Sequence, residues 1–361
     1  MSLGTLIAGY RRAVADAVKL GGKSVPVAWA QVLYARLVHG FGPFYYAQFS
    51  LYRVPAGAWG SFVESVEVNA CTRRMNAAGQ RLVTDKLQFH AWLTAAGVPT
   101  IPILGVLAGP GASPSAEGFA VFSDAESFGR AADGFPDGLF FKTVDGAHGD
   151  GAFPAVRRGS GWCFAGREGT AADLFEHCMA HPAGHSGWLV QPLIRPCAEL
   201  AAGLMPRALG TVRIVTLLRG GTVHLLAGLL KIPVGDSVTD NFSEGASGNL
   251  VVPVDLQTGT LGAGVMSRHR DWPTMVTLDR HPDTGCRISG FQLPFWDDTI
   301  GLIRRTQLGL REAPTLGWDV ALTDGGPLIV EANAGYGVEL HQVAEQRGMR
   351  RELSAILEAR A

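Results

Sequence analysis

The amino-acid sequence predicts an α+β fold, with helices first and most strands later in the chain. Residues 1 to about 80 carry apolar side chains at helical spacing, as in AVADAVKL and WAQVLYARLV. From Leu139 onward, short apolar runs alternate with glycine-containing turns, a pattern typical of antiparallel strands. The length of 361 residues exceeds what one ordinary core supports, so we expect two or three packed subdomains.

Composition narrows the class of protein. Hydrophobic residues make up 47% and charged residues 17%, which indicates a globular chain. The net charge of −1 provides no basic field, so we expect no nucleic-acid partner. The start of the chain carries arginines where a secretory signal keeps its apolar centre, so we expect no signal peptide. The five cysteines lie at least 15 positions apart, which excludes a C-x-x-C pair and favours reduced thiols in a cytoplasmic protein.

The segment from Val25 to Tyr52 is apolar and aromatic. Arg36, His39 and a Gly-Phe-Gly-Pro turn interrupt it, and a membrane span needs about 20 uninterrupted apolar residues. We therefore expect a buried helical hairpin and no membrane span. The alternative is a surface that rests on a membrane or a partner.

Local signals place the later elements. Asp85 offers an N-cap for a helix from Lys86 that Gly97 closes. Pro294 in a first turn starts a second helix that ends near residue 310. Gly220-Gly221 is a tight turn between two long strands. The expected strands cover residues 99–107, 138–142, 187–193, 211–218, 222–232, 318–322 and 327–332.

The strongest chemical signal lies in the last two of these strands. Adjacent antiparallel strands place Asp319 and Glu331 at the same end, and alternation puts Glu331 and Asn333 on one face. Two carboxylates and an amide oxygen suit magnesium, which takes oxygen ligands together with phosphate oxygens and water. The alternative is a hairpin whose acids simply face solvent.

A second signal is a lysine at the end of an apolar strand, followed by a glycine-rich loop. Lys142 precedes glycines at 146, 149 and 151. Backbone N–H groups in such a loop can fold over phosphates, while the lysine supplies a point charge. Taken alone, Gly146, Gly149 and Gly151 are equally compatible with a plain hairpin.

A third signal is the strand that leaves through Gln191, Pro192, Leu193 and Ile194. An apolar strand that continues into a proline-containing linker offers backbone donors and acceptors between apolar walls, as an adenine slot requires. Glu199 follows and is a candidate acceptor for ribose hydroxyls. Without the other signals, this segment is an unremarkable buried strand.

A fourth signal concerns cations in apolar strands. Arg213 and Lys231 stand in TVRIVTLL and LLAGLLKIP, where a buried cation needs an anionic partner. We expect a phosphate or a substrate carboxylate to supply it. The alternative is a structural acid such as Asp255 or Glu339. A polar loop follows, and its candidates for substrate contact are Asp240, Asn241, Ser243, Glu244 and Asn249.

Taken in order, these signals resemble the ATP-grasp superfamily over about residues 84–342. The hairpin, with its twelve-residue step from Asp319 to Glu331, resembles the metal site of its glutamate ligases and glutathione synthetases. The segments TVRIVT, DNFSEG, GWDVA and GPLIVEAN resemble the sugar-transfer-associated ATP-grasp proteins. One departure is Gln191, where many ATP-grasp enzymes have an acid.

The resemblance implies two α/β subdomains that clasp ATP, behind a helical N-terminal region. We divide the chain into 1–80, 81–190 with the glycine loop, and 191–361 with the metal site. Lys86 and Lys142 would contact ATP phosphates, and Glu199 would hold the ribose. Residues 191–194 would frame adenine. Asp319, Glu331 and Asn333 would hold Mg²⁺.

The implied reaction is that of a carboxylate–amine ligase. ATP phosphorylates a substrate carboxylate, and an amine then displaces phosphate, while Arg213 and Lys231 stabilise the reacting groups. Two alternatives remain open: a kinase that releases a phosphorylated small molecule, and a non-catalytic nucleotide-binding partner in polysaccharide assembly. The expected partners are small-molecule carboxylates and amines, and a homodimer remains open.

Overall fold

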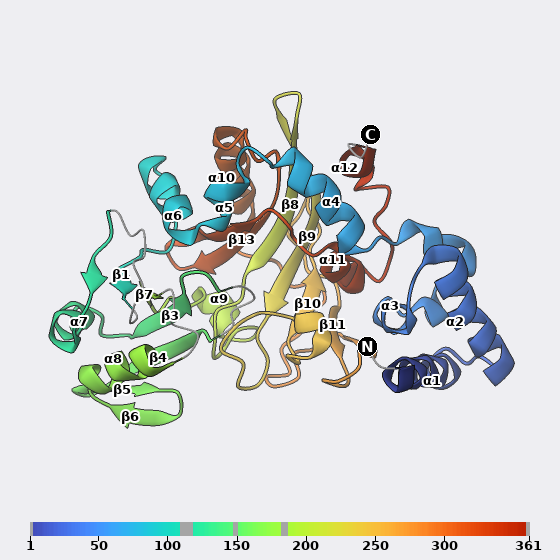
Figure 1. The fold of residues 1–361 in the computed structure, drawn as a ribbon, viewed down its shortest axis with the longest axis horizontal. Coiled ribbons are helices and arrows are strands. Elements are labelled where there is room, and N and C mark those ends of the chain that lie inside the picture. Colours follow the sequence, from blue (N-terminus) through green and yellow to red (C-terminus); the bar gives the residue numbers. More distant parts are fainter. Residues whose placement is uncertain (1–2, 109–117, 147–150, 182–186, 359–361) are drawn as a thin grey trace.

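The computed structural model describes residues 3–108, 118–146, 151–181 and 187–358. The strands of the described residues form two sheets of seven strands each. Figure 1 shows the two sheets side by side, with helices packed around them and a helical N-terminal region at one end. The predicted α+β class and the helical start of the chain are therefore confirmed. Among the described residues, no helix has both the length and the hydropathy needed to cross a bilayer. All five cysteines are unpaired.

The N-terminal region packs against the second sheet. Tyr46, Phe49 and Trp59 form a cluster with Val251 and Val265 of that sheet. The elements of the region are α1 (Leu3–Lys19), α2 (Val25–His39), α3 (Pro43–Gln48), η1 (Leu51–Arg53), η2 (Ala56–Ser61), α4 (Ser65–Met75) and α5 (Gln80–Thr84).

The expected buried hairpin over Val25–Tyr52 is wrong for its first helix. One side of α2 is buried through Ala28, Val32 and Ala35, but its opposite side lies open to solvent. Composition alone did not reveal this, because α2 is apolar on both sides and only one side has a neighbour.

The first sheet has strand order β2-β1-β7-β3-β4-β5-β6. Its strands are β1 (Gly105–Leu107), β2 (Val121–Phe122), β3 (Leu139–Thr143), β4 (Phe153–Arg158), β5 (Gly161–Phe164), β6 (Arg167–Gly169) and β7 (Trp188–Pro192). Alternation along β7 puts Trp188 and Val190 against α7 (Ala125–Ala132) and α8 (Ala171–Ala180), and Leu189 against α6 (Lys86–Ala95). Asp85 caps α6 as predicted, accepting from the N–H groups of Leu87 and Gln88.

The expected strand over residues 99–107 is shorter in the structure. Only Gly105–Leu107 forms a strand, because Pro99 and Pro102 lack the N–H that a ladder needs. Thr100 instead makes a single parallel bridge to Ile329 of the second sheet, which ties the two sheets together.

The second sheet has strand order β12-β11-β10-β9-β8-β13-β14. Its strands are β8 (Val212–Arg219), β9 (Thr222–Ile232), β10 (Leu250–Pro253), β11 (Gly264–Ser267), β12 (Met275–Leu278), β13 (Thr315–Thr323) and β14 (Gly326–Asn333). The Gly220-Gly221 turn joins β8 to β9 as predicted, with φ angles of 58° and 78° that favour glycine. The predicted second helix starts later than expected, at Trp296, because Phe295 has a left-handed backbone.

Successive side chains of a strand point to opposite faces of the sheet, and this determines which side chains of the second sheet face the first sheet. Ile214, Trp318 and Val320 point toward α10 (Trp296–Gly309) and belong to the main core. Arg213 and Asp319 are their neighbours along β8 and β13, so they point to the opposite face. The remaining helices are α9 (Ala198–Ala201), η4 (Ser243–Gly245), α11 (Val338–Glu345) and α12 (Ser354–Leu357).

Candidate functional site

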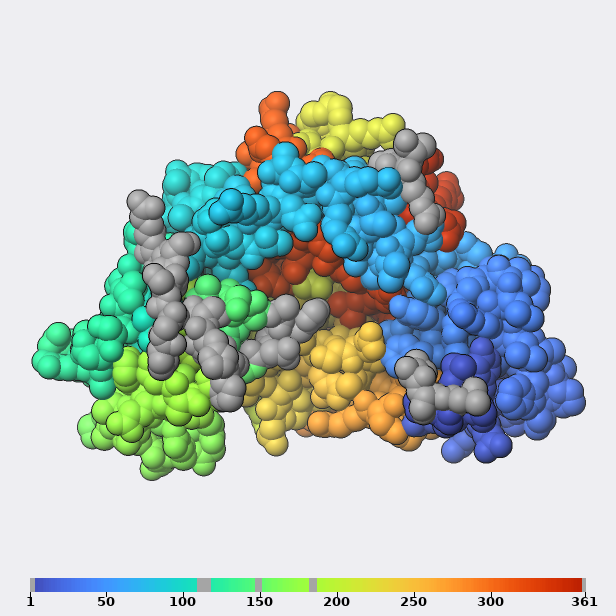
Figure 2. Space-filling model, viewed as in Figure 1, coloured from blue at the N-terminus to red at the C-terminus, as the bar shows by residue number. Residues whose placement is uncertain are grey.

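A cavity of about 1660 Å³ lies between the two sheets. Figure 2 shows this face of the molecule hollowed between the light-blue α4–α5 segment and the yellow segment after β9. The cavity walls come from α3, α4 and α6, from β3 and β7 of the first sheet, and from β8, β9, β13 and β14 of the second. A site in this cavity is lined by side chains of both sheets.

Two lysines mark the wall formed by the first sheet. Lys86 Nζ donates to the carbonyls of Thr143 (3.0 Å), Val144 (3.1 Å) and Gly146. Burial lowers the pKa of Lys142, and burial together with the charge of Lys142 lowers the pKa of Lys86. No acidic side chain among the described residues forms an ion pair with Lys142, so an anion in the cavity would stabilise both lysines.

The glycine loop is only partly described. It connects β3 to β4, which pair antiparallel as the hairpin interpretation requires. Gly146 lines the cavity, whereas Gly151 does not, and Gly149 lies outside the described residues.

The predicted adenine segment lies on the cavity wall. Gln191, Pro192, Leu193 and Ile194 all line it. Gln191 is buried, and its amide donates weakly to the Ile101 carbonyl at 3.4 Å. His90, which the sequence did not single out, contacts the same carbonyl at 3.0 Å, and burial lowers its pKa.

Glu199 is placed differently from the expectation. Its side chain is exposed on α9 and is not among the residues that line the cavity. Asp324 lines the cavity nearby and accepts from the Ala198 N–H at 2.9 Å. Asp324 lies in the turn between β13 and β14, and a turn in the sequence does not indicate that its carboxylate reaches a cavity.

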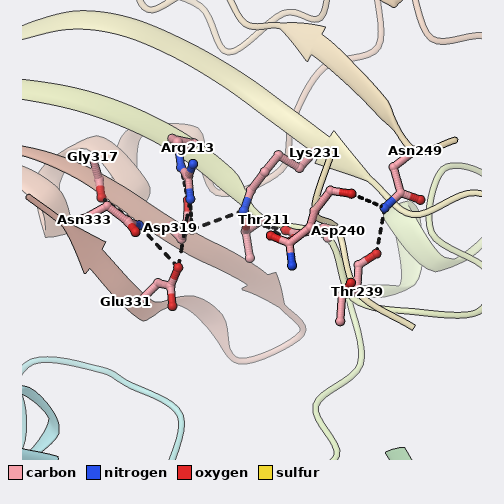
Figure 3. Close-up of polar contacts among 12 residues, drawn as sticks. Thr211, Arg213, Lys231, Thr239, Asp240, Asn249, Gly317, Asp319, Glu331 and Asn333 are labelled. Carbon is pink, nitrogen blue, oxygen red and sulfur yellow. Dashed lines mark hydrogen bonds and ion pairs between the residues drawn. The ribbon is translucent and has the colours of Figure 1, made fainter. Parts of the chain in front are cut away.

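Arg213, Asp319 and Lys231 form a buried ion network (Figure 3). Arg213 donates to both oxygens of Asp319, at 2.7 Å through Nε and 2.5 Å through Nη2. Lys231 donates to Asp319 at 3.1 Å and to Asp240 at 3.2 Å. Burial alone would raise the pKa of Asp319, but the charges of Arg213 and Lys231 outweigh it and hold that pKa well below its usual range.

This network corrects the expectation that a ligand would neutralise the two cations. Their partners are Asp319 and Asp240, rather than Asp255 or Glu339. The reason is the strand register, which places Asp319 of β13 directly opposite Arg213 of β8. The carboxylate that we expected to bind metal is therefore also the one that neutralises Arg213.

The predicted hairpin does bring its three oxygen-bearing side chains together. Asp319 and Glu331 are cross-strand partners, and Asn333 Nδ2 donates to them at 3.4 Å and 3.3 Å. Glu331 and Asn333 line the cavity, and the amide leaves its Oδ1 for another partner, so both fit a magnesium ion. Asp319 fits it less well, because cations already engage both of its oxygens. Among the described residues, no cluster of three or more His, Cys, Asp or Glu suits a metal.

The loop after β9 forms another part of the wall. Asp240, Asn241, Ser243 and Glu244 line the cavity. Asn249 is fully buried behind them; it donates to the carbonyls of Thr239 (2.9 Å) and Asn241 (2.7 Å). We correct its expected role: Asn249 holds the loop in shape and does not face a substrate.

One further wall of the cavity was not predicted from the sequence. Tyr45, Gln48 and Ser65 of the N-terminal region line the cavity together with Glu339 of α11. Glu339 accepts from the Ser65 N–H and, at 3.5 Å, from the Tyr45 hydroxyl. Gln48 is buried, and its Oε1 accepts no hydrogen bond from any described residue. These residues lie far apart in the chain, so no local pattern connects them.

A family model described as "Sugar-transfer associated ATP-grasp" matches residues 70–358. The chain belongs to this ATP-grasp family. The resemblance and the fold expected from the sequence are thereby confirmed. A search of curated proteins finds no match.

A search of solved structures matches this chain to several enzymes at low similarity. A D-alanyl-alanine synthetase A from Vibrio cholerae has 12% identity and a TM-score of 0.40, with 77% of this chain and 65% of that chain covered. An L-amino acid ligase from Bacillus licheniformis has 14% identity and a TM-score of 0.37, with 78% and 49% covered. A biotin carboxylase domain of a 2-oxoglutarate carboxylase from Hydrogenobacter thermophilus, solved with MgADP, has 13% identity and a TM-score of 0.37, with 74% and 46% covered. The ATP-grasp chain thus spans about half to two thirds of the length of these structures.

Proposed function

We propose that this ATP-grasp protein is an ATP- and Mg²⁺-dependent ligase that joins a carboxylate to an amine and releases ADP. One observation carries the proposal. A single cavity has two lysines with lowered pKa on the wall of one sheet and a carboxylate–amide pair on the wall of the other. We also propose that the chain divides at residues 80 and 190. The two sheets on either side of the cavity would then belong mainly to residues 81–190 and 191–361.

The nucleotide would lie along the first sheet. Lys142 would bind its phosphates, since desolvated cations gain most from an added anion. Lys86 already donates to three carbonyls, so it would add positive charge beside the phosphates. Residues 191–194 would frame adenine, with His90 and Asp324 at its margins. Glu331 and Asn333 would hold Mg²⁺, which supplies positive charge to the phosphate oxygens during phosphoryl transfer.

Arg213 is the cation best placed to meet the transferred phosphoryl group. Asp319 occupies its Nε and Nη2, and no described residue accepts from its Nη1. The guanidinium lines the cavity in a fixed orientation, because Asp319 holds it from behind. Such preorganised charge stabilises a transition state without reorganisation at the moment of reaction. Lys231, with Asp319 and Asp240 on either side, would position this group rather than react.

The proposed reaction consists of two displacement steps. A carboxylate oxygen attacks the γ-phosphorus, the bond to the β–γ bridging oxygen breaks, and ADP leaves. The amine nitrogen then attacks the acyl carbon, the acyl carbon–oxygen bond breaks, and inorganic phosphate departs with that carboxylate oxygen. The amine loses its proton on the way to the amide.

The far wall of the cavity supports an amine as the second substrate. Glu244 and Glu339 line it. Burial raises the pKa of Glu339, and the charges of Glu64 and Glu244 raise it further. A ligand ammonium group would relieve this repulsion and donate hydrogen bonds to the two carboxylates.

The test begins with ADP release against panels of amino acids, nucleotide sugars and amines. The active acid is then used with ¹⁸O in its carboxylate. The ligase proposal expects one ¹⁸O atom in the phosphate and an amide product, both lost in Glu331→Gln and Lys142→Ala. A phosphorylated product that retains the label and forms without amine would overturn the proposal in favour of a kinase.

A further inference from the structure

The outward face of α2 is an apolar surface that no other described part of the chain covers. Of the ten exposed residues on this helix, only Arg36 is charged. Leu37 is 81% exposed, Val38 57% and Val25 55%. Figure 1 places α2 at the edge of the molecule, on the side away from the first sheet. The other large apolar side chains exposed on this helix are Val27, Trp29, Leu33 and Tyr34.

This surface is unusual for a helix on a monomeric protein. A surface helix normally presents polar residues opposite its core stripe, whereas α2 is apolar on both sides. Contiguous apolar patches of this kind mark interaction sites. The helix has 15 residues and spans about 22 Å, which is shorter than the ~30 Å core of a bilayer. It can therefore lie in a membrane interface but cannot cross it.

The charge of the N-terminal region distinguishes between an anionic lipid surface and a second copy of the chain as the partner of this surface. Residues 1–63 contain six Lys or Arg and one acid, whereas the whole chain has a net charge of −1. That acid, Asp16, faces inward and accepts from Trp272 (2.8 Å) and Thr274 (3.0 Å). Arg12 is paired with Asp271 at 2.7 Å. The other cations of residues 1–63 are Arg11, Lys19, Lys23, Arg36 and Arg53, of which Arg36 lies close to Glu64.

We propose that the α1–α2 hairpin docks on an anionic lipid surface, with the outward face of α2 in the headgroup–acyl boundary. Cations beside an apolar face are the combination that interfacial helices use, and each basic residue near an anionic surface adds attraction. Trp29 and Tyr34 carry both apolar rings and polar atoms, which suits the same boundary. A second copy of the chain fits less well, because a symmetric contact would bring like charges together.

Vesicle flotation of the full chain tests this proposal, independently of the proposed reaction. Wild type should float with vesicles containing anionic phosphatidylserine and bind at least ten-fold less to purely phosphatidylcholine vesicles. The double variant Leu33→Glu/Leu37→Glu should lose binding. Lys19→Gln/Lys23→Gln should weaken it by roughly five-fold per lysine.

The control is Leu308→Glu, which introduces one glutamate at an exposed leucine on α10 and should leave flotation unchanged. Circular dichroism melts of each variant would check that it is folded. Equal binding to both vesicle types overturns the proposal. A folded wild type that fails to float also overturns the proposal. This holds even if α2 then mediates a dimer, as sedimentation would show, or binds an acidic protein.

Discussion

Replacing Asp319 with asparagine tests the buried ion network directly. The change removes the negative charge between Arg213 and Lys231, whose side chains are only 14% and 4% exposed; that of Asp319 is 2% exposed. Solvent at this depth screens little, and leaving one side of a buried ion pair without its partner costs about 3–5 kcal/mol. We expect a loss of that size in the free energy of unfolding.

Urea denaturation provides the measurement, with Glu331→Gln as the matched control. Glu331 sits opposite Asp319 in the ladder, but its side chain is 40% exposed and 4.0 Å from Arg213. Its neutralisation should cost less than about 1 kcal/mol. A further variant, Arg213→Met/Asp319→Leu, removes both charges together and should recover much of the stability. Losses of equal size for Asp319→Asn and Glu331→Gln would refute this account of the network.

Three other predictions concern ligands. Lys142→Ala should weaken binding of a non-hydrolysable ATP analogue by at least ten-fold, and Gln191→Ala by much less; calorimetric affinities that change equally would remove Lys142 from the phosphate site. Lys86 and Lys142 have lowered pKa values that bound phosphates would raise, so nucleotide binding should take up protons, and the affinity should fall as the pH rises through the lowered pKa values. Calorimetry in buffers of different ionisation enthalpy would detect the proton uptake, and an affinity that stays constant up to pH 10 would contradict the prediction. Glu339→Gln should raise the KM for the amine about ten-fold while leaving the KM for ATP within two-fold; steady-state assays with each substrate varied would find equal changes in the two KM values if Glu339 only supports the fold.

Local signals predicted the parts of the fold that depend on neighbouring residues. Asp85 caps its helix as expected, and the hairpin brings Asp319, Glu331 and Asn333 together. The sequence did not reveal that Arg213 pairs with Asp319, because cross-strand partners 106 positions apart leave no local pattern. It also did not reveal the wall formed by Tyr45 and Glu339, which depends on how α3 packs near α11.

The strand order of the second sheet also has a consequence for synthesis of the chain. β8 lies between β9 and β13, yet β13 leaves the ribosome about 100 residues after β8. At roughly 5–20 residues per second, β8 remains an open edge for several seconds, with Arg213 lacking its acid. Open edges are templates for wrong pairing. A chaperone that shields nascent chains would therefore matter most for this protein between the emergence of residues 219 and 323.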